Sequence, residues 1–379
     1  AFHPAAIQNP RSRRDNQGEV IISMLDLNLT GLATGIGSLP HLKTSEAIKL
    51  ILKFVPDIPF WPQLPRRDSR EGMVSQFSEG LPCLKFNGRD LVYSPLDREK
   101  ELESFYSDVI SFQEGKKEDL DRFKITSEYA QGLHAFYDTL KNSDAKDIIK
   151  CIKCHITGPF TFAASVKDEK GSVLMHDKVF MQAVTEGLKM KALWQMRFFE
   201  EFGKKIIVFI DEPYLGCFGS AYTPLNREEV VSNLAGIASS IRQSGGISGI
   251  HCCGNTDWSM FVDAGVDVIN FDAYSFMDRI ILYADTLSVF LEKGGVLCWG
   301  IVPTQEYERD SSYNGPKLTE AIEEGINKLA DKGANRDLLR KQLIISPSCG
   351  LGSLEEWKAE GIFRLLDSTS LLIREIYGS

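Results

Sequence analysis

The feature that most constrains this chain is a series of eight short apolar runs separated by longer amphipathic stretches. Most of the runs are apolar throughout, which is typical of parallel strands buried on both faces. Parallel strands need crossover connections, and the stretches between the runs are long enough to be helices. The predicted strands cover residues 32–38, 59–63, 151–158, 204–213, 247–253, 266–272, 296–302 and 343–349.

Eight strands alternating with helices predict an α/β fold, a single (β/α)8 TIM barrel over residues 24–379. An open doubly wound sheet is the alternative, but it does not require eight strands. Pro59 and Pro62 predict a poorly formed second strand at an irregular edge. Residues 1–23 show little periodicity, and we interpret them as a leader or tag without function.

The N-terminal half carries additions to the barrel. The spacing of apolar residues predicts a helix at 44–54, and residues 98–145 are charged and mostly helical in pattern. Alternation around Asn87 and Gly88 predicts a β-hairpin within 83–94. We therefore expect a hairpin and helical insertions outside the eight repeats.

Composition limits the partners and the compartment. The net charge is −9, so we expect neither nucleic acid nor an anionic membrane surface as a partner. The eight cysteines are irregularly spaced in a chain long enough to form a full core, which favours reduced thiols and a cytoplasmic protein. No apolar run approaches the roughly 18 residues of a membrane span.

Polar residues gather where the predicted strands end. In a βα barrel, the carboxyl ends of the strands form the active-site face. The strand interiors stay apolar, so the polar ends mark candidate functional positions. They include Ser38, Gln63, Thr157, Gly158, Asp211, Glu212, His251, Cys253, Asn270, Asp272 and Cys349.

The run His-Cys-Cys at 251–253 predicts a metal site. Side chains alternate along a strand, so His251 and Cys253 share one face, and Cys252 packs on the other. Cys349 could supply a second thiolate and Asp272 an oxygen. One imidazole, two thiolates and a replaceable oxygen suit Zn²⁺, and a substrate thiol in the open position would be held as a thiolate. The alternative is that these cysteines only pack.

The motifs together resemble the catalytic half of cobalamin-independent methionine synthase. This family lies in a superfamily with uroporphyrinogen decarboxylase and corrinoid-linked methyltransferases. The resemblance runs in the same order over residues 30–360, and the combination is more specific than any one motif. The motifs are TGIGSLPH (34–41), TGPFTF (157–162), IDEP (210–213), HCC (251–253), DVINFD (267–272) and SPSCGL (346–351).

The resemblance implies a zinc site and its ligands. The family has Glu where this chain has Asp272, and the shorter side chain leaves open direct ligation, ligation through water, or none in one state. Carried over onto this sequence, the implied ligands are His251, Cys253, Asp272 and Cys349.

The resemblance also implies an amino-acid site for homocysteine. Ile36 and Ser38 would hold its carboxylate end, and Asp211 would hold its ammonium. A family Glu that helps there has Gln63 as its nearest equivalent, with Asp68 and Glu71 as alternatives. The predicted floor of the site includes Thr157.

Two departures from the family indicate the methyl donor. The long enzymes have a second barrel that helps bind methyltetrahydrofolate, and this chain has no room for it. They also have a proton-moving His after the seventh strand, where this chain has Thr304. Methylcobalamin or a methyl-corrinoid protein needs no such proton, so either is favoured over 5-methyltetrahydrofolate. Asp211 and Thr304 are the candidate catalytic residues.

The resulting prediction is zinc-dependent methyl transfer to homocysteine, giving methionine, with a corrinoid protein as a candidate partner. One rival keeps the zinc but uses another thiol, such as coenzyme M. A second rival is a metal-free decarboxylase that acts on a porphyrinogen. A third is a protein that binds a corrinoid or a metal without turnover.

Overall fold

The computed structural model describes residues 27–168, 170–221, 225–308 and 312–378. The predicted leader at 1–23 lies outside these residues. The main sheet has seven parallel strands in the order β1-β9-β8-β7-β6-β5-β4. Its strands are β1 (Leu32–Ala33), β4 (Cys151–Thr157), β5 (Lys205–Asp211), β6 (Ile247–Cys252), β7 (Val268–Phe271), β8 (Val296–Val302) and β9 (Leu343–Pro347).

The sheet is curled, and the segment 59–63 lies between its two edges. This segment forms single parallel bridges, from Gln63 to Ser38 and from Phe60 to Lys153. The Lys153 N–H donates to the Pro59 carbonyl at 2.8 Å. The poorly formed second strand predicted for this segment is therefore confirmed, since Pro59 and Pro62 have no N–H to donate to a ladder. The first strand is shorter than predicted, but the (β/α)8-like barrel is confirmed.

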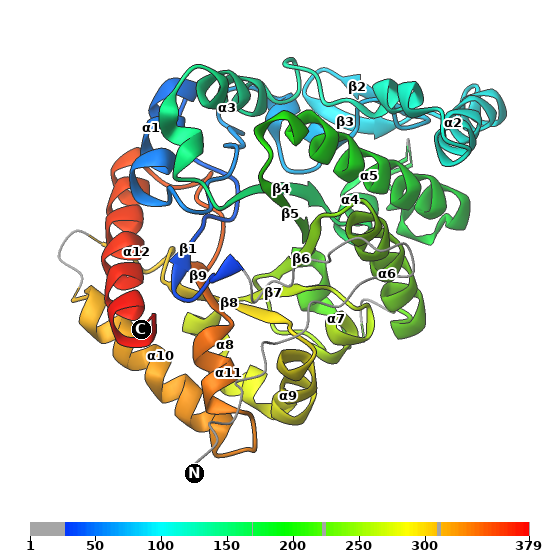
Figure 1. The fold of residues 1–379 in the computed structure, drawn as a ribbon. Helices are drawn as coiled ribbons and strands as arrows, with labels where there is room; N and C mark the ends of the chain where they lie inside the picture. Colours follow the sequence, from blue (N-terminus) through cyan, green and yellow to red (C-terminus); the bar gives the residue numbers. More distant parts are fainter. Residues whose placement is uncertain (1–26, 169, 222–224, 309–311, 379) are drawn as a thin grey trace, which may run out of the picture.

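Helices form the outer layer around the strands (Figure 1). The predicted helix at 44–54 is confirmed. No helix of the described residues is long and apolar enough to cross a bilayer. The α-helices are α1 (Thr44–Phe54), α2 (Arg98–Gln113), α3 (Gln131–Lys141), α4 (Pro159–Ser165), α5 (Lys178–Phe198), α6 (Arg227–Gln243), α7 (Ser259–Asp263), α8 (Ala273–Ile280), α9 (Ala284–Glu292), α10 (Gly315–Ala330), α11 (Arg336–Lys341) and α12 (Glu356–Tyr377).

The predicted additions lie outside the barrel. The hairpin is confirmed as β2 (Leu84–Asn87) and β3 (Asp90–Tyr93), and Gly88 supplies the positive φ of 65° that its turn needs. The predicted helical stretch contains α2, α3 and the 3-10 helix Lys117–Phe123. In Figure 1 the hairpin and α2 lie at the periphery, away from β5 to β9.

Strand residues alternate between two cores. The inner core fills one end of the barrel with side chains from seven strands, including Cys151, Phe209 and Cys298. The outer core lies between the strands and the helices. On the inward face of β4, Cys151 is followed toward the carboxyl end of the strand by Lys153, His155 and Thr157. The barrel interior is thus apolar at its base and polar at its mouth.

Candidate metal centre

Three side chains from two separate strand ends meet at the barrel mouth. One ligand atom from each of His251, Cys253 and Cys349 lies within 4.8 Å of the other two. A tetrahedral zinc with bonds of about 2.0–2.3 Å separates its ligand atoms by about 3.3–3.8 Å. The group is therefore close to the size that one zinc ion requires.

Asn270 orients the imidazole of His251. The two residues are register partners on β6 and β7, and His251 Nδ1 lies 2.5 Å from Asn270 Oδ1. The Asn270 amide donates to the Cys298 carbonyl at 2.8 Å and to Ser346 Oγ at 2.9 Å. Ser346 in turn donates to the Pro347 carbonyl. This chain of donors leaves Asn270 Oδ1 as an acceptor, so Nδ1 of His251 carries its proton and Nε2 is the atom available to a metal.

Hydrogen bonds and charge interactions link the two thiols and the imidazole, and they shift the pKa values of all three groups. A hydrogen bond from Cys253, together with one from His251, outweighs burial and lowers the pKa of Cys349 to about 4. The same contact raises the pKa of Cys253. Burial lowers the pKa of His251, but the hydrogen bond to Cys349 and the charge of Asp211 raise it overall. Metal ligation requires deprotonated thiols and a free Nε2 on His251, so a bound metal would replace these hydrogen bonds.

Ser38 joins the first predicted loop to the loop that carries Cys349. Its carbonyl accepts from the Leu351 N–H at 3.0 Å, and its hydroxyl oxygen accepts from the Gly352 N–H at 3.2 Å. A Cβ at Gly350 would lie 2.4 Å from Ser38 Oγ, so only glycine allows this approach. The predicted substrate loop and the predicted metal loop are thus parts of one hydrogen-bonded unit.

Asp272 does not join the group of ligand atoms. Its Oδ1 accepts from the Ser275 N–H at 2.8 Å and caps the start of α8. Three of the four predicted ligands are brought together, and the fourth stabilises a helix end instead. The structure gives no support to direct ligation by Asp272.

Asp211 lies beside the cluster and has a free oxygen. It is the register partner of His251 and only 7% exposed, and its Oδ1 has no hydrogen-bond partner within the described part of the chain. Burial raises the pKa of Asp211 to about 6, although the charges of Lys153 and His251 lower it. A buried acceptor without a donor is costly, so this oxygen is suited to receive a donor from a ligand.

The other predicted substrate residues have protein partners. The Ile36 carbonyl accepts from Lys153 Nζ at 2.6 Å. The Gln63 amide donates to Gln76 Oε1 at 2.7 Å, and the Thr157 hydroxyl donates to the Met73 carbonyl. These two hydrogen bonds fix the loop after residue 63 through Met73 and Gln76.

Two residues near the cluster, Thr304 and Glu212, contact other protein groups. Thr304, a candidate catalytic residue, is buried with its Oγ1 3.2 Å from Ser348 Oγ. Glu212 accepts from the N–H groups of Phe160 and Thr161, both at 2.9 Å, and holds the start of α4. Cys252 belongs to the outer core, on the face that alternation predicted.

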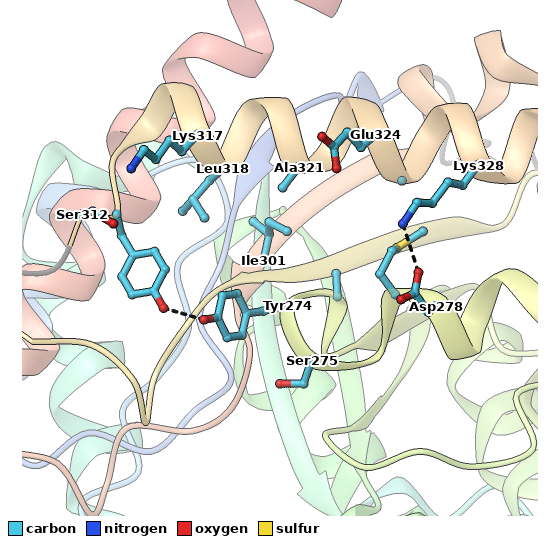
Figure 2. A pocket seen from close by; sticks show the side chains of 14 residues that line it. Tyr274, Ser275, Asp278, Ile301, Ser312, Lys317, Leu318, Ala321, Glu324 and Lys328 are labelled. Carbon is cyan, nitrogen blue, oxygen red and sulfur yellow. Dashed lines mark hydrogen bonds and ion pairs between the residues drawn. The ribbon is translucent and has the colours of Figure 1, made fainter.

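A separate recess lies away from the cluster. It has a volume of about 360 Å³ and lies between α8 and α10, with Ile301 of β8 in its wall. Figure 2 shows Tyr274 at one end and Lys328 paired with Asp278 at the other, and the Tyr274 hydroxyl is hydrogen-bonded to that of Tyr313. None of the three cluster residues lines it.

Comparison with known proteins adds little. No protein-family model and no curated protein matches the chain. Among solved structures, it is similar to D-psicose 3-epimerase at 14% identity and a TM-score of 0.35, covering 67% of this chain and 86% of that one. It is also similar to the GH20 catalytic modules of a pneumococcal exo-β-D-N-acetylglucosaminidase at 13% identity and a TM-score of 0.43, covering 93% and 85%. Likenesses this weak carry no functional argument.

Two polar residues of the site are given no role by the sequence. The sequence marks Asn270 only as a strand end, and its spacing of two residues from Asp272 on an inward face was the available signal. Lys153 is absent from the predicted site, although a lysine within an otherwise apolar strand is unusual.

Proposed function

We propose that this protein is a zinc-dependent methyltransferase that methylates the thiol of homocysteine to form methionine. The proposed donor is methylcobalamin or a methyl-corrinoid protein. The observation that carries the proposal is the cluster of His251, Cys253 and Cys349 next to Asp211, a buried carboxylate with a free oxygen. A thiol that carries an ammonium group matches these two features.

The donor set fits zinc. One imidazole nitrogen and two thiolate sulfurs are ligands that zinc prefers, and three protein ligands leave a fourth position for a substrate. Bound there, zinc would lower the pKa of a substrate thiol and hold it as the nucleophilic thiolate. His251, Cys253 and Cys349 would hold the ion, and Asn270 would keep Nε2 of His251 directed at it.

The neighbouring residues orient the amino acid. Asp211 pairs with the ammonium, and the turn 36–38 receives the carboxylate. Losing a buried charge pair of this kind typically costs about 2–5 kcal/mol in binding. Held at both ends, homocysteine presents its sulfur at the cluster in one orientation.

The chemistry requires no proton at the leaving group. The thiol would release its proton to solvent, the sulfur would form a bond to the methyl carbon, and the cobalt–carbon bond of the donor would break with its electron pair left on cobalt. Thr304 occupies the position at which the resembled family has a proton-moving His. Its hydroxyl contacts Ser348 and is not a titratable acid near neutral pH. This favours a corrinoid donor over methyltetrahydrofolate.

The test combines metal content with turnover. We expect about one zinc per chain in purified protein by mass spectrometry, loss of that zinc in Cys349→Ala, and methionine formation from methylcobalamin and homocysteine. Methylation of coenzyme M in place of homocysteine would identify the other thiol as the substrate. Protein that binds no zinc even after zinc is added would contradict the mechanism.

A further inference from the structure

Lys153 places a positive charge inside the barrel, beneath the proposed site. It lies on the inward face of β4 and is completely buried. Its Nζ donates to the Ile36 carbonyl at 2.6 Å. The rings of Phe209 and Phe60 lie 4.4 and 5.8 Å from Nζ, so the ammonium is held between aromatic faces.

Among the described residues, no Asp or Glu forms an ion pair with Lys153 within 4.0 Å. Burial lowers the pKa of Lys153, and the charge of Asp211 opposes that shift from a distance. A buried ammonium whose charge is not balanced by a contacting carboxylate is costly, which indicates a role beyond packing.

The hydrogen bond to Ile36 connects this charge to the turn at 36–38. The same turn is fixed by the Gly37 carbonyl, which accepts from the Gln63 N–H at 3.0 Å, and by the bonds of Ser38 to residues 351 and 352. The turn is therefore rigid, with Lys153 on its inner side. Asp211 lies at the end of the neighbouring strand β5.

The barrel thus holds two opposite charges, one beneath the proposed site and one at its mouth. One is the ammonium under the turn, and the other is the Asp211 carboxylate with its free oxygen. An α-amino acid carries the complementary pair, a carboxylate and an ammonium on one carbon. Electrostatic complementarity of this kind selects ligands more than it adds affinity.

We propose that Lys153 is a positioning residue whose buried ammonium makes the turn at 36–38 a carboxylate subsite, so that the site selects thiols carrying an α-carboxylate. The proposal rests on the proposed function, because it takes homocysteine as the ligand. It predicts that removing the charge weakens only those ligands that have the carboxylate.

The experiment compares three thiols by titration calorimetry on zinc-loaded protein. Homocysteine has both charged groups, 3-aminopropane-1-thiol lacks the carboxylate, and 4-sulfanylbutanoate lacks the ammonium. In Lys153→Met, we expect the affinity for homocysteine and 4-sulfanylbutanoate to fall about tenfold or more, with that for 3-aminopropane-1-thiol unchanged. Lys153→Gln keeps a donor without the charge and should behave like Lys153→Met. Lys191→Met, at a fully buried lysine on α5, is the matched control and should change none of the three.

Other results would overturn the proposal. If Lys153→Met lowered the affinity for all three thiols equally, Lys153 would only support the fold. Equal affinity of the unaltered protein for homocysteine and 3-aminopropane-1-thiol would exclude a carboxylate subsite, and this comparison requires no variant. Binding of none of the thiols would reject the proposed function as well, whereas binding without carboxylate preference would leave the proposed function in place.

Discussion

At the scale of single residues, the orientation of one imidazole decides whether the cluster can bind metal. Asn270 is fully buried, and its amide nitrogen donates to the Cys298 carbonyl and to Ser346 Oγ. Its amide oxygen is therefore the atom that faces His251. The tautomer of His251 follows from this arrangement. Residues that hydrogen-bond to a metal ligand and fix its orientation commonly contribute strongly to metal affinity.

Asn270→Ala should weaken zinc binding by about 10–100-fold, because His251 would lose the acceptor that fixes its proton on Nδ1. Competition with a chromophoric chelator measures this change. Cys252→Ala is the control, since Cys252 lies in the outer core and should leave zinc affinity unchanged. Equal zinc affinity in Asn270→Ala and the unaltered protein would contradict the role given to Asn270.

Asp211→Asn should stabilise the protein above about pH 6 while weakening homocysteine binding. The folded-state pKa of Asp211 is raised to about 6, so its charge destabilises the fold above that pH. The destabilisation shrinks as pH falls from about 6 toward the unfolded value near 4, where both forms are neutral. Urea unfolding at pH 8 and pH 5 checks this, and a stability difference that grows at pH 5 would have the wrong sign.

At the scale of elements, the strand-to-helix turn after β4 depends on close contact with the turn after β5. Glu212 follows β5 and binds the first N–H groups of α4, and Gly158 leaves room for it. A Cβ at Gly158 would lie 2.2 Å from Glu212 side-chain carbons. This close contact between the two turns positions Thr157 and Asp211, the paired last residues of β4 and β5.

Gly158→Ala should lower the free energy of unfolding by about 1–3 kcal/mol, because Glu212 is buried and cannot move without losing its hydrogen bonds. Gly236→Ala is the matched control. Gly236 lies within α6, and an added Cβ there would meet no atom within 4 Å, so alanine should stabilise by about 0.5–1 kcal/mol. Chemical denaturation measures both, and equal effects would show that the contact with Glu212 does not matter.

At the scale of the whole molecule, metal binding should be coupled to stability. The cluster joins the ends of β6 and β9, and Ser38 ties the β9 loop to the start of the barrel. A ligand that binds only the folded protein stabilises it by about 2.7 kcal/mol at 100 times its Kd.

Zinc should therefore raise the thermal midpoint of the apo protein by a few degrees, and a chelator should reverse the shift. Cys349→Ala should show no such response, because it lacks one of the three ligands. Differential scanning calorimetry tests this, and a zinc-induced shift of the same size in Cys349→Ala would place the binding elsewhere.

The sequence by itself determined the barrel, the polar strand ends and the division of 251–253 into two inward residues and one outward residue. These follow from local periodicity, since alternation and strand length are set by the backbone. The tertiary structure decided which groups meet. The segment at 59–63 bridges to Ser38 and Lys153, Asn270 bonds to residues on β8 and β9, and Lys153 bonds to the turn at 36–38. Such hydrogen bonds depend on the partners that the closed barrel brings near, and a single sequence does not contain that proximity.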